Sequence, residues 1–112
     1  MIHEMKLKKE YFDLIVSGKK VYEVRLNDEK RRLIKVGDKI KFRKEPELKE
    51  CVMVSVKDLI LFNSFLEMAQ CLPNEKIGFN GYTPEEIADV YHKFYSSTDE
   101  EKFGVLAILI EK

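Results

Sequence analysis

Three ionisable side chains of opposite sign lie close together in the segment Gly18-Lys19-Lys20-Val21-Tyr22-Glu23-Val24-Arg25. Gly18 follows an apolar helical pattern, where a left-handed residue typically ends a helix, so Lys20 is expected at the mouth of the next element. Glu23 and Arg25 are two residues apart in an alternating segment, and they therefore project from one face of a strand. A cluster of this kind shifts pKa values in both directions, which makes these residues candidates for catalysis or for ligand binding.

The residue types admit three kinds of function. In a hydrolase, a partly desolvated Lys20 would act as base or nucleophile, Glu23 would orient water or take a proton, and Arg25 would hold Glu23 or an oxyanion. In a binding module, Lys20 and Arg25 would contact a phosphate or a base edge, and Glu23 would accept a hydrogen bond from an exocyclic amine. In a structural module, the three groups would form an ordinary ion-pair network on a solvated strand face.

The elements that position this cluster follow from hydrophobic periodicity and from capping residues. Alternating apolar residues predict strands over 1–8, 21–26, 39–43 and 51–56, the last continuing towards Phe62, and a closing buried strand over 103–110. Helices are predicted over 10–17, from Ser64 to about Cys71, and from Thr83 onwards. Residues 74–82 are expected to form a loop, and residues 96–102 a polar connection. Only one helix separates the first two strands, which favours an α+β protein with a small, mostly antiparallel barrel or highly curved sheet.

Other apolar side chains are assigned to the core. A stripe at helical spacing after Thr83 is expected to be core and consists of Ile87, Val90, Tyr91 and Phe94. Cys51 opens an alternating apolar stretch and is expected to be a buried thiol. Three aromatic residues could stack on a base, although aromatic residues at helix ends and in loops more often belong to the core: Phe79, Tyr82 and Tyr95.

Length and charge narrow the class of protein further. The chain has 112 residues and a net charge of zero, a length typical of one domain, here expected over residues 1–112. The charge is unevenly distributed, because residues 1–50 hold 15 basic and 10 acidic side chains whereas residues 51–112 hold 5 and 10. Residues 19–44 alone hold 11 basic and 4 acidic side chains, Arg31 and Arg32 among them. This excess predicts either an electropositive surface for an anionic ligand or a solvated strand face.

Several other classes of protein are disfavoured. No apolar run approaches the ~20 residues that a membrane-spanning helix needs, and no signal-type apolar segment follows Met1. Cys51 and Cys71 form no CxxC pair, and His3 and His92 stand far apart, so neither a disulfide framework nor a metal site is expected. No glycine-rich phosphate-binding motif is present, and no cofactor is expected. These features predict a cytoplasmic protein with reduced thiols.

The pattern Gly18-x-Lys20-x-x-Glu23-x-Arg25 resembles the G-x-K-x-x-E-x-R motif of ASCH domains, which are relatives of the PUA domain. Residues 7–15, the turn at residues 35–38 and the closing helix–strand pair are also similar to that family, so the resemblance covers nearly the whole chain. It implies a PUA-like β-barrel with flanking helices and a cleft lined by the motif. Most ASCH proteins are inferred to bind RNA, which implies an RNA, nucleoside or nucleotide partner here and leaves the oligomeric state open.

One bacterial branch of this family is similar in size and hydrolyses the amide of N4-acetylcytidine. In that branch a lysine at the position of Lys20 is catalytic, a threonine stands at the position of Glu23, and a further catalytic glutamate lies roughly where Asn80 stands. If the chain is an enzyme, the resemblance implies Lys20 as a catalytic residue, and the chemistry of its side chain adds Glu23, which could replace the carboxylate that is absent at Asn80. The full set of residues expected to bind a ligand is Gly18, Lys20, Glu23, Arg25, Arg31, Arg32, Asn80 and Tyr82.

Overall fold

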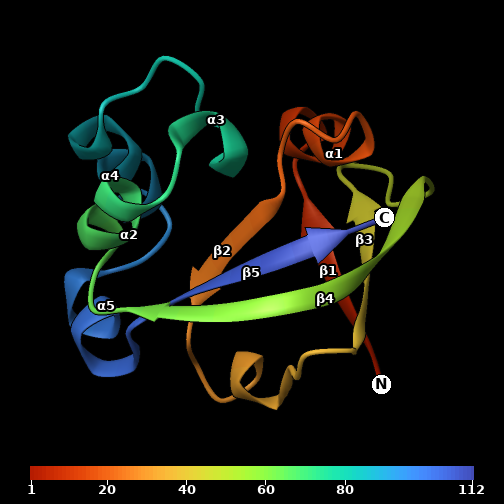
Figure 1. The fold of residues 1–112 in the computed structure, drawn as a ribbon, viewed down its shortest axis with the longest axis horizontal. Coiled ribbons are helices and arrows are strands. Elements are labelled where there is room, and N and C mark those ends of the chain that lie inside the picture. Colours follow the sequence, from red (N-terminus) through yellow and green to blue (C-terminus); the bar gives the residue numbers. More distant parts are fainter.

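Five strands form one curled sheet in the computed structural model, which describes residues 1–112. They are β1 (Ile2–Leu7), β2 (Tyr22–Leu26), β3 (Lys39–Lys44), β4 (Cys51–Phe62) and β5 (Val105–Glu111). Their spatial order is β1-β3-β4-β5-β2, and only the pair β1–β3 is parallel. The sheet curls into a half-barrel whose edge strands are β1 and β2 (Figure 1). The predicted α+β class with a mostly antiparallel, highly curved sheet is confirmed.

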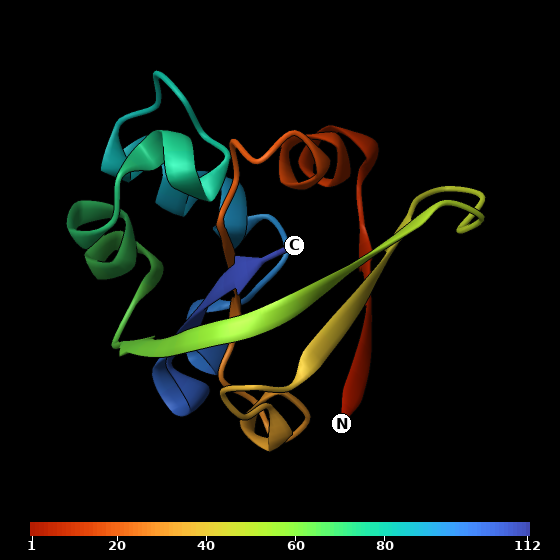
Figure 2. The same ribbon diagram turned by 45° about the vertical axis from the view of Figure 1, so that its right-hand side comes forward.

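Five α-helices and one short 3-10 helix connect the strands. α1 (Lys9–Val16) follows β1, and the 3-10 helix η1 (Arg31–Leu33) follows β2. The other helices all lie between β4 and β5 in the chain and are α2 (Phe65–Cys71), α3 (Asn74–Ile77), α4 (Pro84–His92) and α5 (Ser97–Phe103). Figure 1 shows these four gathered on one side of the sheet, while α1 lies over its opposite end. From the turned view of Figure 2, β3 and β4 run out together as a long hairpin away from the four helices. No helix combines the length and the apolar character needed to cross a membrane.

The buried side chains form two clusters on opposite faces of the sheet. The first fills the inside of the half-barrel under α1, and Ile40 and Phe42 of β3 are completely buried there, as their alternation predicts. The second lies between the sheet and the helices that follow β4, with Phe65 of α2 and Ile87 of α4 completely buried. The sheet is therefore covered on both sides along the strands that separate the two clusters.

β5 separates the two clusters and thereby determines where the charged face of β2 points. Leu106 and Ile108 belong to the first cluster, and the alternate residues Val105 and Ala107 to the second. In the antiparallel register, Glu23 lies opposite Ile108 and Arg25 opposite Leu106. Cross-strand partners share a face of the sheet. The two charged side chains of β2 therefore point into the half-barrel, and the prediction that they could lie on a solvated strand face is wrong.

Two segments predicted to be irregular contain helices. α3 lies within the predicted loop 74–82. α5 covers most of the predicted polar connection 96–102 and includes Phe103, which was expected to begin the closing strand. Each helix has only one buried residue, Ile77 in α3 and Glu100 in α5. α5 begins at a true N-cap, because Ser96 Oγ accepts a hydrogen bond from the backbone N–H of Asp99 at 3.1 Å. A helix with one buried residue has no apolar stripe, so periodicity does not detect it.

Two side chains predicted to be buried are exposed. Cys51 is the first residue of β4, and its side chain faces solvent at the end of the β3–β4 hairpin. Phe94 is 57% exposed because α4 ends at His92, before the helical repeat can carry the ring into the core. Phe94 instead lies at the mouth of the cavity described below.

Asp38 ties the start of the chain to the turn before β3. Its Oδ2 lies 2.8 Å from His3 Nε2 and accepts the backbone N–H of Lys35 at 3.1 Å, and its Oδ1 lies 3.5 Å from the terminal amine of Met1. The contact with His3, followed by that with Lys35, lowers the pKa of Asp38 from 3.8 to about 2. The carboxylate therefore stays charged in the folded protein well below the pH at which it is protonated in an unfolded chain.

We expect Asp38→Asn to reduce stability at neutral pH and to flatten its pH dependence in acid. Because the folded-state pKa is the lower one, the contribution of this carboxylate is complete above about pH 4 and is lost as the pH falls towards 2. Urea unfolding at a series of pH values measures the effect. Asp89→Asn is the matched control, since Asp89 is exposed and forms no ion pair. An acid slope in Asp38→Asn equal to that of the wild type would contradict the prediction.

Candidate functional site

A cavity opens at the seam between the edge strands β1 and β2. It has a volume of about 130 Å³ and is lined by 14 residues, most of them from β1, α1, β2 and the end of α4. The aromatic side chains in its lining are Tyr11, Phe79, Tyr91, Phe94 and Tyr95. The acidic and basic side chains are Lys6, Lys8, Lys20, Glu23, Arg25 and Glu45. A protein cavity of about 150 Å³ can hold one benzene ring, so the space suits a single planar ring.

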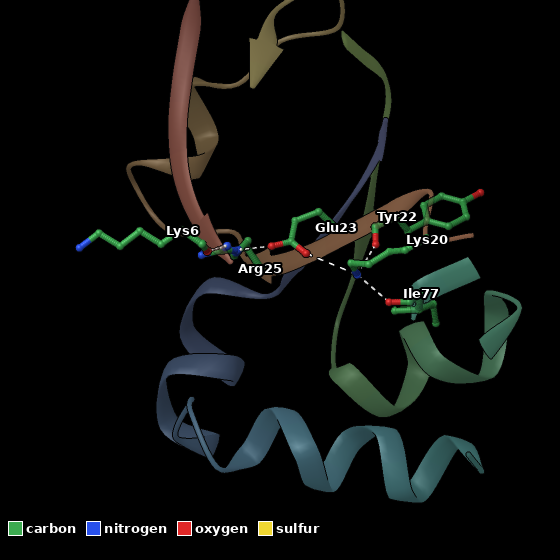
Figure 3. A network of polar contacts seen from close by, with 6 residues as sticks. All are labelled: Lys6, Lys20, Tyr22, Glu23, Arg25 and Ile77. Carbon is green, nitrogen blue, oxygen red and sulfur yellow. Dashed lines mark hydrogen bonds and ion pairs between the residues drawn. The ribbon is translucent and has the colours of Figure 1, made fainter. Parts of the chain in front are cut away.

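Lys20 enters this cavity from the short turn after α1. Gly18, with φ of 83°, ends the helix as predicted, and the backbone N–H of Lys20 donates to the carbonyl of Leu14 at 3.0 Å. Lys20 is 3% exposed, and its Nζ donates to the carbonyl oxygens of Tyr22 and Ile77, both at 2.6 Å (Figure 3). The same Nζ lies 3.4 Å from Glu23 Oε1. Three acceptors therefore surround one buried amine.

The position of this amine also depends on a glycine far along the chain. Gly78 ends α3 with φ of 99°, and a Cβ there would lie 3.1 Å from Cδ of Lys20. Glycine adopts such a φ without strain and leaves room for the lysine side chain. Ile77, the residue before Gly78, supplies the carbonyl oxygen that accepts a hydrogen bond from Lys20 Nζ. The helix α3, which periodicity does not predict, thus holds Lys20 in place.

Glu23 and Arg25 continue the network across the seam. Glu23 Oε2 accepts a hydrogen bond from Arg25 Nε at 2.7 Å, while Oε1 faces Lys20. Arg25 Nη2 in turn donates to the backbone carbonyl of Lys6 at 2.9 Å. Figure 3 shows the continuous path of contacts from Ile77 through Lys20, Glu23 and Arg25 to Lys6. The network links the two edges of the half-barrel and forms the polar wall of the cavity.

Burial and mutual charge shift the pKa values of these three groups. Burial lowers the pKa of Lys20, and the nearby Glu23 carboxylate offsets this only in part. Burial by itself would raise the pKa of Glu23, but the charges of Arg25 and Lys20 outweigh it and hold that pKa below its usual value. The Glu23 charge likewise outweighs burial at Arg25 and raises the pKa of its guanidinium. Glu23 is therefore a carboxylate at neutral pH, and Arg25 is its permanent counter-charge.

The aromatic wall of the cavity is supported from behind by Phe65. The ring of Phe65 stacks on Tyr91 with centroids 4.6 Å apart and an interplanar angle of 2°, and on Tyr95 at 5.4 Å. Burial raises the pKa of Tyr91 well above its usual value, so its phenol is neutral and can donate a hydrogen bond. At the mouth, Lys8 Nζ lies 4.5 Å from the ring centroid of Phe94. The wall therefore combines flat apolar surfaces with hydroxyl groups and a cation.

Of the residues expected to bind a ligand, the structure brings Lys20, Glu23 and Arg25 together in this cavity. Asn80 does not line it and borders a separate hollow beside Lys19 and Lys76. Tyr82 is 44% exposed and packs edge-on against Phe79 with centroids 5.4 Å apart, outside the cavity. The loop before α4 therefore contributes only Phe79 to the cavity wall.

The remaining expected residues lie around the cavity. Gly18 shapes the turn that delivers Lys20 and does not line the cavity. Arg32 is exposed, and its Nε donates to the backbone carbonyl of Asn27 at 2.8 Å. Arg31 borders a neighbouring hollow that it shares with Arg25. Arg31 and Arg32 thus lie outside the cavity, whereas Lys20 and Arg25 are the basic residues of 19–44 that line it.

Several lining residues were not recognised as site residues in the sequence. Helical spacing predicts Tyr91 and Phe94 as core residues, and no motif distinguishes Lys6 and Lys8, yet all four line the cavity. Tyr95, for which the sequence allows either a core position or stacking on a base, lines the cavity. One signal was available, because a tyrosine in an otherwise non-polar stripe needs a polar neighbour for its hydroxyl.

The cavity offers an amine, a guanidinium, carboxylates and phenols as its polar groups. No group of three or more His, Cys, Asp or Glu side chains lies close enough together to hold a metal ion. The polar groups of the cavity suit a ligand held by hydrogen bonds, charge and stacking.

Comparison with solved structures finds close relatives of this chain. The crystal structure of hypothetical protein PH0355 is 43% identical, with a TM-score of 0.89 over 99% of this chain and 98% of that one. The solution structure of protein PF0455 from Pyrococcus furiosus is 42% identical, with a TM-score of 0.74 over 99% of this chain and 96% of that one. The ASCH protein from Zymomonas mobilis is 16% identical and shares the fold, with a TM-score of 0.67 over 99% of this chain and 67% of that one. No curated protein matches this chain significantly.

The family model described as the ASCH domain matches residues 5–112. The matched region contains the motif from Gly18 to Arg25, the helices and the seam at which the cavity opens. The predicted PUA-like α+β fold is confirmed by the shared fold of the Zymomonas mobilis protein. Since the match extends over nearly all of the sequence, this chain belongs to the ASCH domain family.

Proposed function

We propose that the cavity binds a base of an RNA or of a modified nucleotide. The observation that carries this proposal is the buried Lys20–Glu23–Arg25 network in the wall of a ring-sized cavity that is otherwise largely aromatic. Membership of the ASCH family supports an RNA-binding or hydrolase-like module. A base combines a flat π face with hydrogen-bonding edges. The aromatic side chains of the wall suit the face, and the charged network suits the edges.

Each part of the wall has a distinct task in this proposal. Glu23 is held as a carboxylate by Lys20 and Arg25, and its remaining lone pairs accept a hydrogen bond from an exocyclic amine. The hydroxyl of Tyr91 donates to a ring nitrogen or carbonyl oxygen. Phe94 and Tyr95 offer faces for stacking, which tolerates any base and is worth about 1–3 kcal/mol per base. Hydrogen bonds to Glu23 then decide which base is preferred.

We expect Phe94→Ala to weaken binding of a short single-stranded RNA by about tenfold while leaving the fold intact. The ring is 57% exposed, so its removal creates no buried cavity in the core. Fluorescence or calorimetric titration measures the affinity, and thermal melting checks the fold. Leu61→Ala is the matched control, because Leu61 is 65% exposed on β4 and lies outside the cavity. Equal affinities of Phe94→Ala and the wild type would remove Phe94 from the binding surface.

The proposed function itself is tested with a panel of RNAs and modified nucleosides at two salt concentrations. Binding at low salt that is lost in Lys20→Met and in Arg25→Gln, both checked for folding, is the expected result. Binding that is absent at low salt, or that neither substitution changes, would overturn the proposal. Salt dependence separates phosphate contacts, which weaken with salt, from stacking and base contacts, which do so far less.

A second candidate function is hydrolysis of the amide of an N4-acylated cytidine. The observation that favours it is the lowered pKa of Lys20, because a buried amine that loses its proton can act as base or nucleophile. Water adds across the amide C–N bond, the acyl group leaves as a carboxylic acid, and the exocyclic amine of cytidine takes the proton. The three acceptors around Lys20 Nζ favour the ammonium form, so the amine has to lose one of these contacts before it reacts.

Incubation with N4-acetylcytidine and chromatographic detection of cytidine tests this candidate. Turnover is expected to rise with pH as Lys20 loses its proton, and to disappear in Lys20→Met. Turnover retained in Lys20→Met, or no turnover by the wild type at any pH at which it is folded, would leave only the binding function.

A further inference from the structure

A second hollow adjoins the cavity on the outer side of the network. It has a volume of about 460 Å³ and is lined by Glu4, Met5, Lys6, Arg25, Lys30, Arg31 and Arg43. Lys6 and Arg25 line both the cavity and this hollow. The two spaces therefore adjoin at Lys6 and at Arg25, the side chain that ends the buried network.

The basic residues of this hollow are only partly neutralised. Arg43 Nη2 lies 2.9 Å from Glu4 Oε1, and Arg25 is paired with Glu23. The cations Lys6, Lys30 and Arg31 form no ion pair with a carboxylate of the protein. The nearby Asp28 accepts the backbone N–H of Arg31 at 3.0 Å, and its charge only partly offsets the effects of burial and of Arg25 on the Arg31 guanidinium. The hollow therefore has an excess of positive charge at its Arg31 side.

Arg31 also has an unmet hydrogen bond. Its Nε is buried and has no acceptor within hydrogen-bonding distance. Burial, together with the positive charge of Arg25, lowers the pKa of Arg31. Two arginines that line one hollow and repel each other are both stabilised by an anion that accepts hydrogen bonds from them. A tetrahedral oxyanion has enough oxygens to do so.

We propose that this hollow binds the phosphate of the nucleotide whose base occupies the adjoining cavity. The inference rests on the proposed base-binding function and narrows its ligand to a phosphorylated one, a nucleotide or an RNA strand, as opposed to a free base or nucleoside. The shared residues Lys6 and Arg25 place the two subsites side by side, as the base and phosphate of one nucleotide are. The guanidinium of Arg31, which lines the hollow and forms no ion pair with a carboxylate, is the cation that the phosphate neutralises.

Titrations of ¹⁵N-labelled protein with inorganic phosphate, with the four nucleosides, with their 5′-monophosphates and with a short single-stranded RNA test this inference. Inorganic phosphate is expected to shift the amide signals of Lys30 and Arg31. The preferred nucleoside 5′-monophosphate is expected to bind about tenfold more tightly than the nucleoside, the effect of one charge-assisted contact. Arg31→Gln should abolish that difference and leave nucleoside binding unchanged. RNA that binds more tightly than the monophosphate and is weakened by Arg31→Gln identifies a backbone phosphate as the occupant.

Lys35→Gln is the matched control, because it removes one positive charge from an exposed residue that lines neither space. Nucleosides that bind as tightly as their monophosphates, with no phosphate-induced shift at Arg31, would overturn the phosphate site while base binding stands. Phosphate shifts that require Arg31, without binding of any nucleoside or RNA, would uphold the anion site and remove the base-binding proposal. Equal losses in Arg31→Gln and Lys35→Gln would show a diffuse effect of net charge and overturn the inference.

Discussion

Glu23→Ala is expected to lower the free energy of unfolding by about 3–5 kcal/mol, because it leaves buried positive charges without their counter-charge. Glu23 is 5% exposed and pairs through one oxygen with Arg25 at 2.7 Å and through the other with Lys20 at 3.4 Å. Neither cation can turn to solvent without giving up its contact with a backbone carbonyl. Urea unfolding of the wild type and the variant at neutral pH measures the loss.

The matched control is Glu4→Ala, which also breaks an ion pair with an arginine. The side chain of Glu4 is 57% exposed and pairs with Arg43, so its loss should cost less than about 1 kcal/mol. Similar losses in the two variants would mean that the Glu23 network is no more than an ordinary surface ion pair. A strong loss in Glu23→Ala combined with unchanged ligand binding in a folded Glu23→Gln variant would show that the network only braces the half-barrel.

The stability contribution of Glu23 also has a defined pH dependence. Its pKa is lower in the folded protein than in the unfolded chain, since Arg25 and Lys20 outweigh the effect of burial. The carboxylate therefore stabilises the fold fully above its ordinary pKa, and this stabilisation is lost as the pH falls through the lowered folded-state pKa. As the pH falls from the ordinary pKa of a glutamate through the lowered folded-state pKa of Glu23, the Glu23→Gln variant should therefore lose less stability than the wild type.

Phe65→Ala is expected to cost about 3–5 kcal/mol of stability and to abolish ligand binding as well. Phe65 is completely buried and supports the rings of Tyr91 and Tyr95, two residues of the cavity wall, from the side opposite the cavity. Truncation removes both stacking contacts and leaves a void into which either tyrosine can turn. Urea unfolding gives the stability, and titration with the RNA used for Phe94→Ala gives the affinity.

Phe65→Leu separates the two effects, because it keeps most of the buried volume and removes the aromatic stacking. It should cost less than about 1.5 kcal/mol of stability, so the protein stays folded and its affinity can be measured. Reduced affinity in this folded variant is the expected result. An affinity equal to that of the wild type would mean that the positions of Tyr91 and Tyr95 do not depend on Phe65, or that they do not matter to the ligand.

Glu100 illustrates what local sequence patterns do not reveal. It lies in a segment predicted to be a polar connection, yet it is 8% exposed and its Oε2 accepts the backbone N–H of Phe65 at 2.7 Å. Its Oε1 lies 2.9 Å from Nε2 of the exposed His92. These contacts join the beginning of α2, the end of α4 and α5. No spacing in the sequence predicts them, because their partners are 35 and 8 residues away.

The sequence by itself determined the elements whose signals are local. Gly18 ends α1 with a positive φ, Ser64 and Thr83 cap the helices they were expected to cap, and the long strand continues to Phe62. Alternation also predicted the inward side chains of β3. Each of these features depends on the conformational preference of one residue or on hydrogen bonds that span three or four residues, so neighbouring residues suffice to predict it.

Only the tertiary structure decided where the charged motif lies and what it contacts. Sequence spacing placed Glu23 and Arg25 on one face of a strand but could not say whether that face meets solvent. The register with β5 turned it into the half-barrel, and α3 brought the carbonyl of Ile77 to Lys20 from 57 residues away. In the folded protein these three charged groups are removed from water and form a network beside aromatic rings. The physical reason is that burial and pKa depend on every group packed around a side chain, and most of those groups come from distant parts of the chain.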